Sequence, residues 1–388
     1  MYHLRRLSAL VLSLAIAPLL FLPTPAAAAN EDSMPLVLSS ASALLMEKET
    51  GTVLLQQNAH QKLEPASVTK IMTLLLVMEA VDSGRLSLDE LVPVSAHAAG
   101  MGGSQVYLKE GEQLSVSDLI KCVAVVSGND CAVALAERLA GSESAFVDQM
   151  NQKAQSLGMA DTHFVNCTGL PAPGHLTSVW DIALMSRELI LRHPDIQQYT
   201  TIWTDSIRNG AFGLTNTNRL VRFYDGATGL KTGFTASAQY CMSATAQRNG
   251  MELIAVVMKA PTTAQRFQDA SSLLDYGFAN YALITPQPES PLAPVDVLLG
   301  RSKTVQPQLQ RECHLLVEKT QADQVTTRVD LAQDVQAPVD PGQTLGEFQV
   351  YVGNELRDSV PIVAAQGVDR LSVPGLFSQL LRRLLFAG

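Results

Sequence analysis

Three short motifs in this 388-residue sequence place a hydroxyl close to a basic or amide side chain. In chain order they are Ser67-Val68-Thr69-Lys70, Ser127-Gly128-Asn129 and Lys231-Thr232-Gly233. Each alone is commonplace: a helix cap followed by a surface lysine, a turn, or the end of a strand. Each occurs once, however, and together they contain a nucleophile, a base and hydrogen-bond donors, the groups that catalyse acyl transfer.

The first motif predicts a nucleophile and its base. A serine and a lysine three residues apart at the start of a helix lie on one face, one turn from each other. Lys70 is therefore expected to take the proton of the Ser67 hydroxyl, which requires the amine to be neutral. Its ordinary pKa of about 10.4 must fall, through burial on an apolar helix and through a second cation, Lys231. The amides at the helix start would favour the developing negative charge.

The other two motifs supply the remaining groups. Ser127 is expected to relay a proton to a leaving amine, and the Asn129 amide to hold the basic amine and a substrate peptide group. Gly233 allows its strand to lie close to a ligand, so that the backbone N–H of Phe234 joins that of Ser67 in an oxyanion hole.

The elements that must position these residues alternate between strand and helix patterns from residue 36 to 285. Two hairpins are predicted, Ala41–Glu47 with Thr52–Gln57 and Ala238–Gln247 with Glu252–Met258, the second around an Asn-Gly turn. Ser67–Val81 is apolar enough to be a helix buried nearly all round. Further helices are expected at Val116–Val126, Ala132–Ala140, Ala145–Ser156, Ser178–Leu191 and Arg266–Tyr281. Strands at both ends with helices between them predict an α/β (α+β) domain built on an antiparallel sheet.

A small all-β domain is predicted over residues 292–365. It follows the proline-spaced stretch Thr285–Pro294 and consists of short, turn-separated, β-rich segments. These segments are Val295–Leu299, His314–Glu318, Val325–Leu331, Thr344–Val352 and Val360–Ala364.

Residues 1–29 have the pattern of a secretory signal peptide. Arg5 and Arg6 precede an apolar run from Leu10 to Leu22, and small residues end the segment at Ala29. The apolar run is shorter than the roughly 20 residues of a membrane-spanning helix. The protein is therefore expected to be exported, to the outer face of the cytoplasmic membrane, the periplasm or the cell-wall space.

Residues 371–388 predict an amphipathic helix that lies on a membrane surface. Apolar residues from Val373 to Leu385 recur at helical spacing, while Arg382 and Arg383 lie on the opposite side. The alternative is a terminal helix that packs on the protein's own core. Loss of residues 1–29 changes the net charge from -9 to -11, so a basic and apolar patch is the feature suited to an anionic bilayer.

The composition excludes some other classes of function. A net charge of -9 argues against a nucleic-acid-binding protein, which would present a basic face. The five cysteines are widely spaced, form no C-x-x-C motif and have no histidines at metal-ligand spacing, so neither a metal site nor a cofactor is predicted. An odd count leaves at least one thiol unpaired.

In this order the three motifs resemble the signature of penicillin-binding proteins and serine β-lactamases. Wider stretches are similar to the exported D-alanyl-D-alanine carboxypeptidases, which are low-molecular-mass penicillin-binding proteins. The resemblance is close over residues 36–285 and extends to the layout of the β domain and the terminal helix. It rests on residues 65–73 (Pro-Ala-Ser-Val-Thr-Lys-Ile-Met-Thr), 126–130, 162–166 with 168–170, and 229–235.

The resemblance implies a serine peptidase acting on peptidoglycan. Ser67 would attack the carbonyl between the two terminal D-alanines of a muropeptide stem, expel the last one, and lose its acyl group to water. Lys231, Thr232 and the helix-borne Arg266 would bind the terminal carboxylate. The family also implies covalent acylation of Ser67 by β-lactam antibiotics.

Two other functions are open at this point. A class A β-lactamase shares the motifs but uses a glutamate between the second and third to activate water, and residues 145–187 contain none. A catalytically inactive cell-wall-binding scaffold would have no need of Ser67, Lys70, Ser127, Asn129 and Lys231 together.

Overall fold

The strands predicted at the two ends of residues 36–285 meet in one antiparallel sheet. Strands β1 (Ser42–Glu47) and β2 (Val53–Gln57) form the first hairpin, and β8 (Gln239–Arg248) and β9 (Met251–Ala260) form the second. β1 pairs with β9, and β7 (Ala227–Thr235) pairs with β8, which gives the strand order β2-β1-β9-β8-β7. The chain therefore returns to the same sheet after the mainly helical segment 58–226. The computed structural model describes residues 35–375, 377 and 385.

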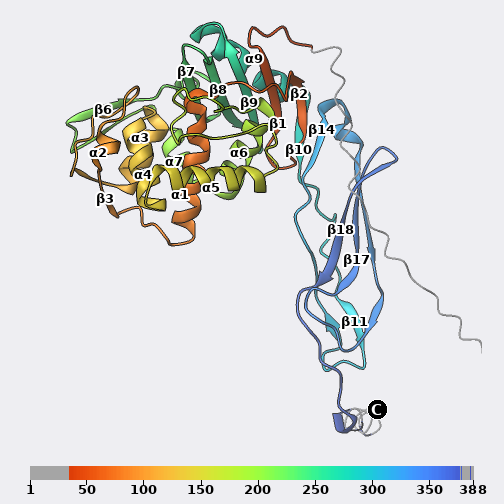
Figure 1. The fold of residues 1–388 in the computed structure, drawn as a ribbon. Coiled ribbons are helices and arrows are strands. Elements are labelled where there is room, and N and C mark those ends of the chain that lie inside the picture. The colour runs from red at the N-terminus through yellow and green to blue at the C-terminus, as the bar shows by residue number, and fades with distance from the viewer. Residues whose placement is uncertain (1–34, 376, 378–384, 386–388) are drawn as a thin grey trace, which may run out of the picture.

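Helices cover both faces of this sheet (Figure 1). Helix α9 (Thr263–Asn280) packs on one face, where Leu273 and Leu274 share a core with the side chains of β1, β8 and β9. Helix α6 (Val179–Arg192) packs on the other face, and α1 (Lys70–Asp82) packs on α6. Helices α3 (Val116–Val125), α4 (Asn129–Ala140) and α5 (Glu143–Ser156) surround α1. The α/β (α+β) fold class predicted from the sequence is confirmed.

Helix α1 is buried on all sides, as its apolar sequence predicts, but it begins later than expected. Ser67 lies in a 3₁₀ turn, Ala66–Thr69, and the α-helix starts only at Lys70. In a 3₁₀ turn the side chains at i and i+3 eclipse each other, which places Lys70 directly over Ser67. Ala66 has a positive φ of 48°, an unusual conformation for alanine that the sequence does not signal.

The remaining elements of this region are short. They comprise the pairs β3 (Leu91–Pro93) with β4 (Gln113–Ser115) and β5 (Thr204–Ile207) with β6 (Phe212–Thr215), the helices α2 (Ala96–Ala99), α7 (Gln197–Thr200) and α8 (Leu220–Phe223), and a 3₁₀ turn, Pro194–Ile196.

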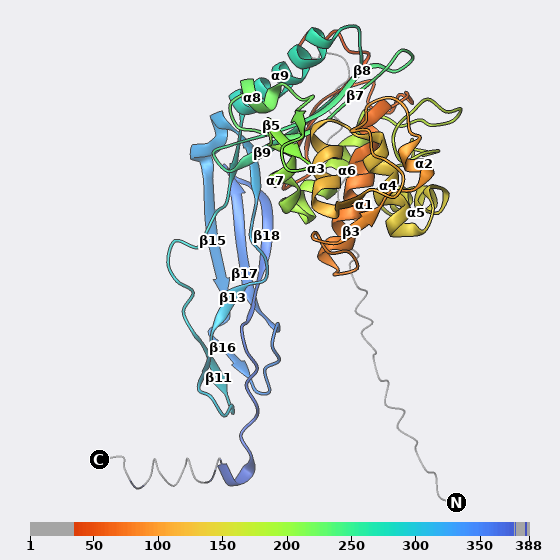
Figure 2. The ribbon, with the colours of Figure 1, turned by 90° about the vertical axis from the view of Figure 1, so that its left-hand side faces the viewer.

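An elongated all-β domain extends away from the helical region (Figures 1 and 2). Strand β10 (Tyr281–Ile284), which follows α9 directly, pairs with β14 (Leu315–Glu318) and joins the two parts. The domain contains a four-stranded sheet, β13-β18-β17-β15, and a three-stranded sheet, β12-β11-β16. Their bounds are β11 Val295–Leu298, β12 Thr304–Val305, β13 Pro307–Leu309, β15 Val325–Leu331, β16 Asp334–Gln336, β17 Thr344–Val352 and β18 Glu355–Ala364. A 3₁₀ helix, Lys319–Gln324, leads into β15.

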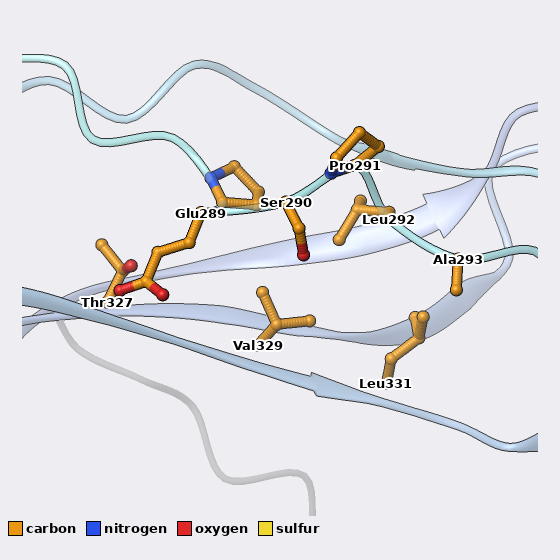
Figure 3. A pocket seen from close by; sticks show the side chains of 9 residues that line it. Glu289, Ser290, Pro291, Leu292, Ala293, Thr327, Val329 and Leu331 are labelled. Carbon is orange, nitrogen blue, oxygen red and sulfur yellow. The ribbon is translucent and has the colours of Figure 1, made fainter.

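A groove of about 320 Å³ lies in this β domain between residues 288–293 and the edge strand β15. Leu292, Val329 and Leu331 point into it, and Glu289 lies at one end (Figure 3). None of the motif residues lines this groove.

The predicted signal peptide, residues 1–29, lies outside the described residues. Of the predicted membrane-surface helix, 371–388, only residues 371–375, 377 and 385 are described. Among them Val373, Phe377 and Leu385 are exposed. Within the described part of the chain, the structure holds no helix with the length and apolar character needed to cross a membrane.

Candidate active site

The three motifs converge on one cleft of about 260 Å³. Three segments spread over more than 150 residues of sequence contribute to it: the 3₁₀ turn before α1, the loop between α3 and α4, and strand β7. Helix α9 adds Arg266. The residues that line the cleft are Ser67, Ser104, Ser127, Thr217, Thr232, Gly233, Phe234, Tyr240 and Arg266. Thr217 and Tyr240 have no place in the sequence-based prediction, because only folding brings them here.

The turn that carries Ser67 is enclosed between two glycines. A Cβ atom on Gly233 would lie 3.0 Å from the Ser67 amide nitrogen, so strand β7 passes directly alongside the turn. On the other side, a Cβ atom on Gly169 would lie only 1.8 Å from the Ala66 carbonyl oxygen. The backbone of another segment therefore approaches the turn closely on both sides of Ser67, and a side chain at Gly233 or Gly169 would prevent this approach.

Lys70 is in contact with Ser67 and is wholly buried. Its Nζ donates to Ser67 Oγ over 3.0 Å and to the Thr168 carbonyl oxygen over 2.7 Å. Burial lowers the pKa of Lys70 to about 7, against smaller opposing contributions from Cys167, Asp130 and Cys131. The neutral amine is therefore accessible near neutral pH, at hydrogen-bond distance from the hydroxyl that it is predicted to deprotonate.

A loop that the sequence did not single out as chemical forms the cover over Lys70. Asn166 Oδ1 accepts hydrogen bonds from the backbone N–H groups of Thr168 and Gly169, which shapes the loop. Thr73, one turn along α1 from Lys70, donates its hydroxyl to the Cys167 carbonyl. Hydrogen bonds within the loop and to α1 therefore hold it over Lys70, and the amine beneath it is shielded from water.

The second motif presents two buried polar atoms without hydrogen-bond partners among the described residues. They are Ser127 Oγ and Asn129 Oδ1. Ser127 has a positive φ of 64°, and Asn129 begins α4 and donates its amide to the Gly102 carbonyl over 2.7 Å. Buried polar groups are almost always satisfied, so these two atoms are available to a ligand or to water at the cleft.

Strand β7 and helix α9 supply two more buried cations, Lys231 and Arg266. Burial, and the charges of Lys70 and Arg266, lower the pKa of Lys231 well below its ordinary value. Arg266 donates to the Gly233 carbonyl, stacks over Tyr240 with 5.5 Å from guanidinium carbon to ring centroid, and has a free Nε. Burial lowers its pKa to about 10.

Among the described residues these cations have no carboxylate partners. Within the described part of the chain, no ion pair involves Lys70, Lys231 or Arg266. Thr232, between Lys231 and the strand end, donates its hydroxyl to Thr217 Oγ1 over 2.7 Å. An anionic ligand is the obvious counterpart to such a cleft, because unpaired buried charge is costly.

Phe234 forms one wall of the cleft with its side chain rather than only its backbone. It is 54 % exposed and stacks on Tyr240, with ring centroids 4.5 Å apart.

Across the described residues, no three His, Cys, Asp or Glu side chains gather closely enough to hold a metal ion.

Comparison with known proteins assigns this arrangement to a family. Residues 28–262 match the family described as D-alanyl-D-alanine carboxypeptidase, and residues 287–370 match the penicillin-binding protein 5 C-terminal domain. The chain belongs to the D-alanyl-D-alanine carboxypeptidase family. It is thus a member of a serine peptidase family, as the sequence predicted.

Relatives of this family align with nearly the whole chain. The D-alanyl-D-alanine carboxypeptidase DacF of Bacillus subtilis is 37% identical over 369 residues, covering 93% of this chain and 95% of its own. DacC of Escherichia coli is 33% identical, covering 90% of this chain and 89% of its own. These carboxypeptidase relatives agree with the main hypothesis and give no support to the β-lactamase alternative.

Solved structures agree with the fold. Penicillin-binding protein 5 of Haemophilus influenzae superimposes with a TM-score of 0.73 at 28% identity, covering 87% of this chain and 100% of its own. Penicillin-binding protein D2 of Listeria monocytogenes, in its ampicillin-bound form, has a TM-score of 0.58 at 37% identity and covers 63% of this chain and 99% of its own.

The pKa of Lys70 predicts how acylation depends on pH. Lys70 accepts a proton only when neutral, so the rate of Ser67 acylation by a fluorescent penicillin should fall as the pH drops through about 7 and level off above it. The rate should be measured between about pH 5 and 9, with thermal unfolding at each pH as the control for integrity. A flat rate over that range would contradict a base of lowered pKa.

The close approach of Gly169 to the nucleophile turn predicts a sharp difference between two glycines. Gly169 and Gly174 have similar positive φ values, 83° and 81°, but only at Gly169 does a Cβ atom meet the backbone of the turn. Gly169→Ala should slow acylation by about a hundredfold by displacing Ser67, whereas Gly174→Ala should cost only about 1 kcal/mol of stability. Equal acylation rates in the two variants would refute the role of this contact.

Proposed function

We propose that this protein is a serine-type D-alanyl-D-alanine carboxypeptidase that removes the terminal D-alanine from peptidoglycan stem pentapeptides. The observation that carries the proposal is Arg266, a buried cation that lines the same cleft as Ser67 and, among the described residues, has no carboxylate partner. Lys231, also buried and without such a partner there, directly precedes the cleft residue Thr232, whose carbonyl accepts from its Nζ. A substrate with a free carboxylate next to the bond that is cut would provide the missing negative charge. Internal peptide bonds have no such group, which makes the enzyme a carboxypeptidase.

In the first step Ser67 attacks the carbonyl carbon between the two D-alanines while Lys70 takes the hydroxyl proton. The Ser67–Lys70 hydrogen bond of 3.0 Å supports this direct transfer. The N–H groups of Ser67 and Phe234 form the oxyanion hole that stabilises the tetrahedral intermediate, and the contact of Gly233 with the turn supports their juxtaposition. Two adjacent backbone segments thereby hold both donors rigidly.

In the second step the bond to the leaving D-alanine breaks, and its nitrogen takes a proton through Ser127. The unpartnered Ser127 Oγ supports this role, since a relay group needs a free lone pair and a free proton. Asn129 Oδ1, also unpartnered, accepts the N–H of the substrate peptide group. Water then attacks the acyl-enzyme, and the shortened stem is released.

β-Lactams acylate the same serine in this proposal. Their carboxylate takes the place of the terminal carboxylate at Lys231, Thr232 and Arg266, and the lactam carbonyl reaches Ser67. The ampicillin-bound form of the Listeria protein supports it. Glu143, which lies just before the segment 145–187, is engaged by the Cys167 N–H and by His97.

The rest of the chain fits an exported, membrane-associated enzyme. We retain the predicted limits: a signal peptide over 1–29, a catalytic domain over 36–285, a β domain over 292–365 and a membrane-surface helix over 371–388. The apolar run and small-residue end of the first segment support export, and exposure of Val373, Phe377 and Leu385 supports contact with a bilayer.

The decisive experiment compares a pentapeptide stem with the same peptide amidated at its C-terminus. The wild type should release D-alanine from the acid and react roughly a hundredfold less well with the amide, because the amide carries no charge for Arg266. Arg266→Gln should reduce kcat/KM for the acid by about tenfold or more and leave the amide nearly unaffected.

Ser67→Ala is the inactive control in this experiment and should release no D-alanine while its thermal unfolding stays unchanged. Retained activity in Ser67→Ala, or equal turnover of acid and amide by the wild type, would overturn the proposed function.

Deletion of residues 371–388 tests the membrane proposal. The mature protein should sediment with vesicles that contain anionic lipids, and the truncated protein should remain in the supernatant with its activity on small peptides intact. Arg382→Glu together with Arg383→Glu should weaken vesicle binding without removing the apolar face. A full-length mature protein that stays in the supernatant would show that the segment is no anchor.

A further inference from the structure

His175 is a buried histidine with both ring nitrogens engaged. The backbone N–H of Val165 donates to Nδ1 over 2.9 Å, and Nε2 lies 2.8 Å from Thr69 Oγ1. The side chain is 2% exposed. Because a backbone N–H can only donate, Nδ1 must be the acceptor, and the neutral ring therefore carries its proton on Nε2 and donates it to Thr69.

These two partners lie on opposite sides of the enclosure around Lys70. Thr69 directly precedes Lys70 in the turn that carries Ser67. Val165 opens the loop whose Thr168 carbonyl accepts the Lys70 Nζ proton. His175 thus connects the floor of the enclosure to its cover, and it is bonded to a neighbour of the catalytic base on one side and to the covering loop on the other.

We propose that neutral His175 is a positioning residue, which holds the loop 165–169 against the Ser67–Lys70 turn and so keeps Lys70 dehydrated and able to act as the base. The inference rests on the proposed function, because it assigns His175 a part in the acylation of Ser67. His175 itself touches no reacting atom. Its effect passes through the loop and through the water that the loop excludes.

The surroundings of His175 keep it neutral at the pH at which Lys70 works. Burial, and to a lesser degree the charge of His163, lower the pKa of His175 to about 4. The ring also packs on Phe164, with centroids 5.8 Å apart. A proton on Nδ1 would face the Val165 N–H and break the attachment of the loop, so the connection is stable at neutral pH and is lost only well below pH 5.

The charged and titratable groups that face Lys70 come from three elements. Asp130 and Cys131 belong to α4, Cys167 belongs to the covering loop, and Lys231 belongs to β7. The first three raise the pKa of Lys70, so burial is the cause that lowers it. If water entered beneath the loop, Lys70 would be less desolvated, and its pKa would rise toward its ordinary value.

The test compares a substitution that removes both hydrogen bonds with one that retains them. His175→Leu loses donor and acceptor, whereas the amide of His175→Gln supplies one of each. Acylation of Ser67 by a fluorescent penicillin should be followed as a function of pH in the mature protein. In His175→Leu the midpoint of the rate should move up by about one pH unit, with about a tenfold lower rate at pH 7 and recovery in more alkaline buffer.

His175→Gln should retain the wild-type midpoint. His193→Leu is the matched control, because His193 is also buried but pairs with Asp82 at the far end of α1. Because the role of His193 is purely structural, its loss should lower thermal stability and leave the midpoint of the acylation rate unchanged. An unchanged midpoint in His175→Leu would overturn the proposal.

A second pair of variants covers the case in which His175→Leu fails to fold. Thr69→Val removes the acceptor for Nε2 with little change of shape, and Thr69→Ser keeps it. The valine variant should shift the midpoint upward and the serine variant should not; the same midpoint in both would refute the connection. A wild type that neither reacts with penicillin nor releases D-alanine would instead refute the proposed function, and the role of His175 with it.

Discussion

The structure depends on keeping one amine out of water. A lysine on the surface is protonated at neutral pH and cannot accept a proton, so Lys70 must lie where its charged form is unfavourable. Helix α1 is accordingly not an outer helix but the centre of the helical layer, enclosed by α3, α4, α5 and α6. The sheet lies behind these helices, and the loop over Thr168 closes the last open side.

The same enclosure gives the cleft its selectivity. With Lys70, Lys231 and Arg266 buried together, the folded protein contains charge repulsion that the surrounding hydrophobic core must offset. In the proposed function a carboxylate relieves this repulsion on binding, so part of the attraction for substrate is prepared in the folded protein. The unpartnered Ser127 Oγ and Asn129 Oδ1 also favour ligand binding, because a peptide group can form hydrogen bonds with both atoms.

The sequence was sufficient for what depends on residue type and local period. The Asn-Gly hairpin, the buried helix and the groups of the three motifs are encoded in short stretches, and the structure brings Ser67, Ser127, Thr232, Gly233, Phe234 and Arg266 to one cleft. The roles of these residues stay proposals. Contacts between distant segments were beyond such reasoning: Thr217 beside Thr232, Gly169 against Ala66, and the 3₁₀ turn at Ser67 follow from packing.

The covering loop also contains a buried cysteine whose reactivity depends on whether the loop is open. Cys167 is wholly buried in it, and burial raises the pKa of its thiol, so a thiol reagent can react only when the loop lifts. The rate of that reaction at Cys167, corrected for the rate of an exposed thiol, gives the free energy of opening above Lys70. Catalysis and thiol reactivity should therefore respond in opposite directions to any change that loosens this segment.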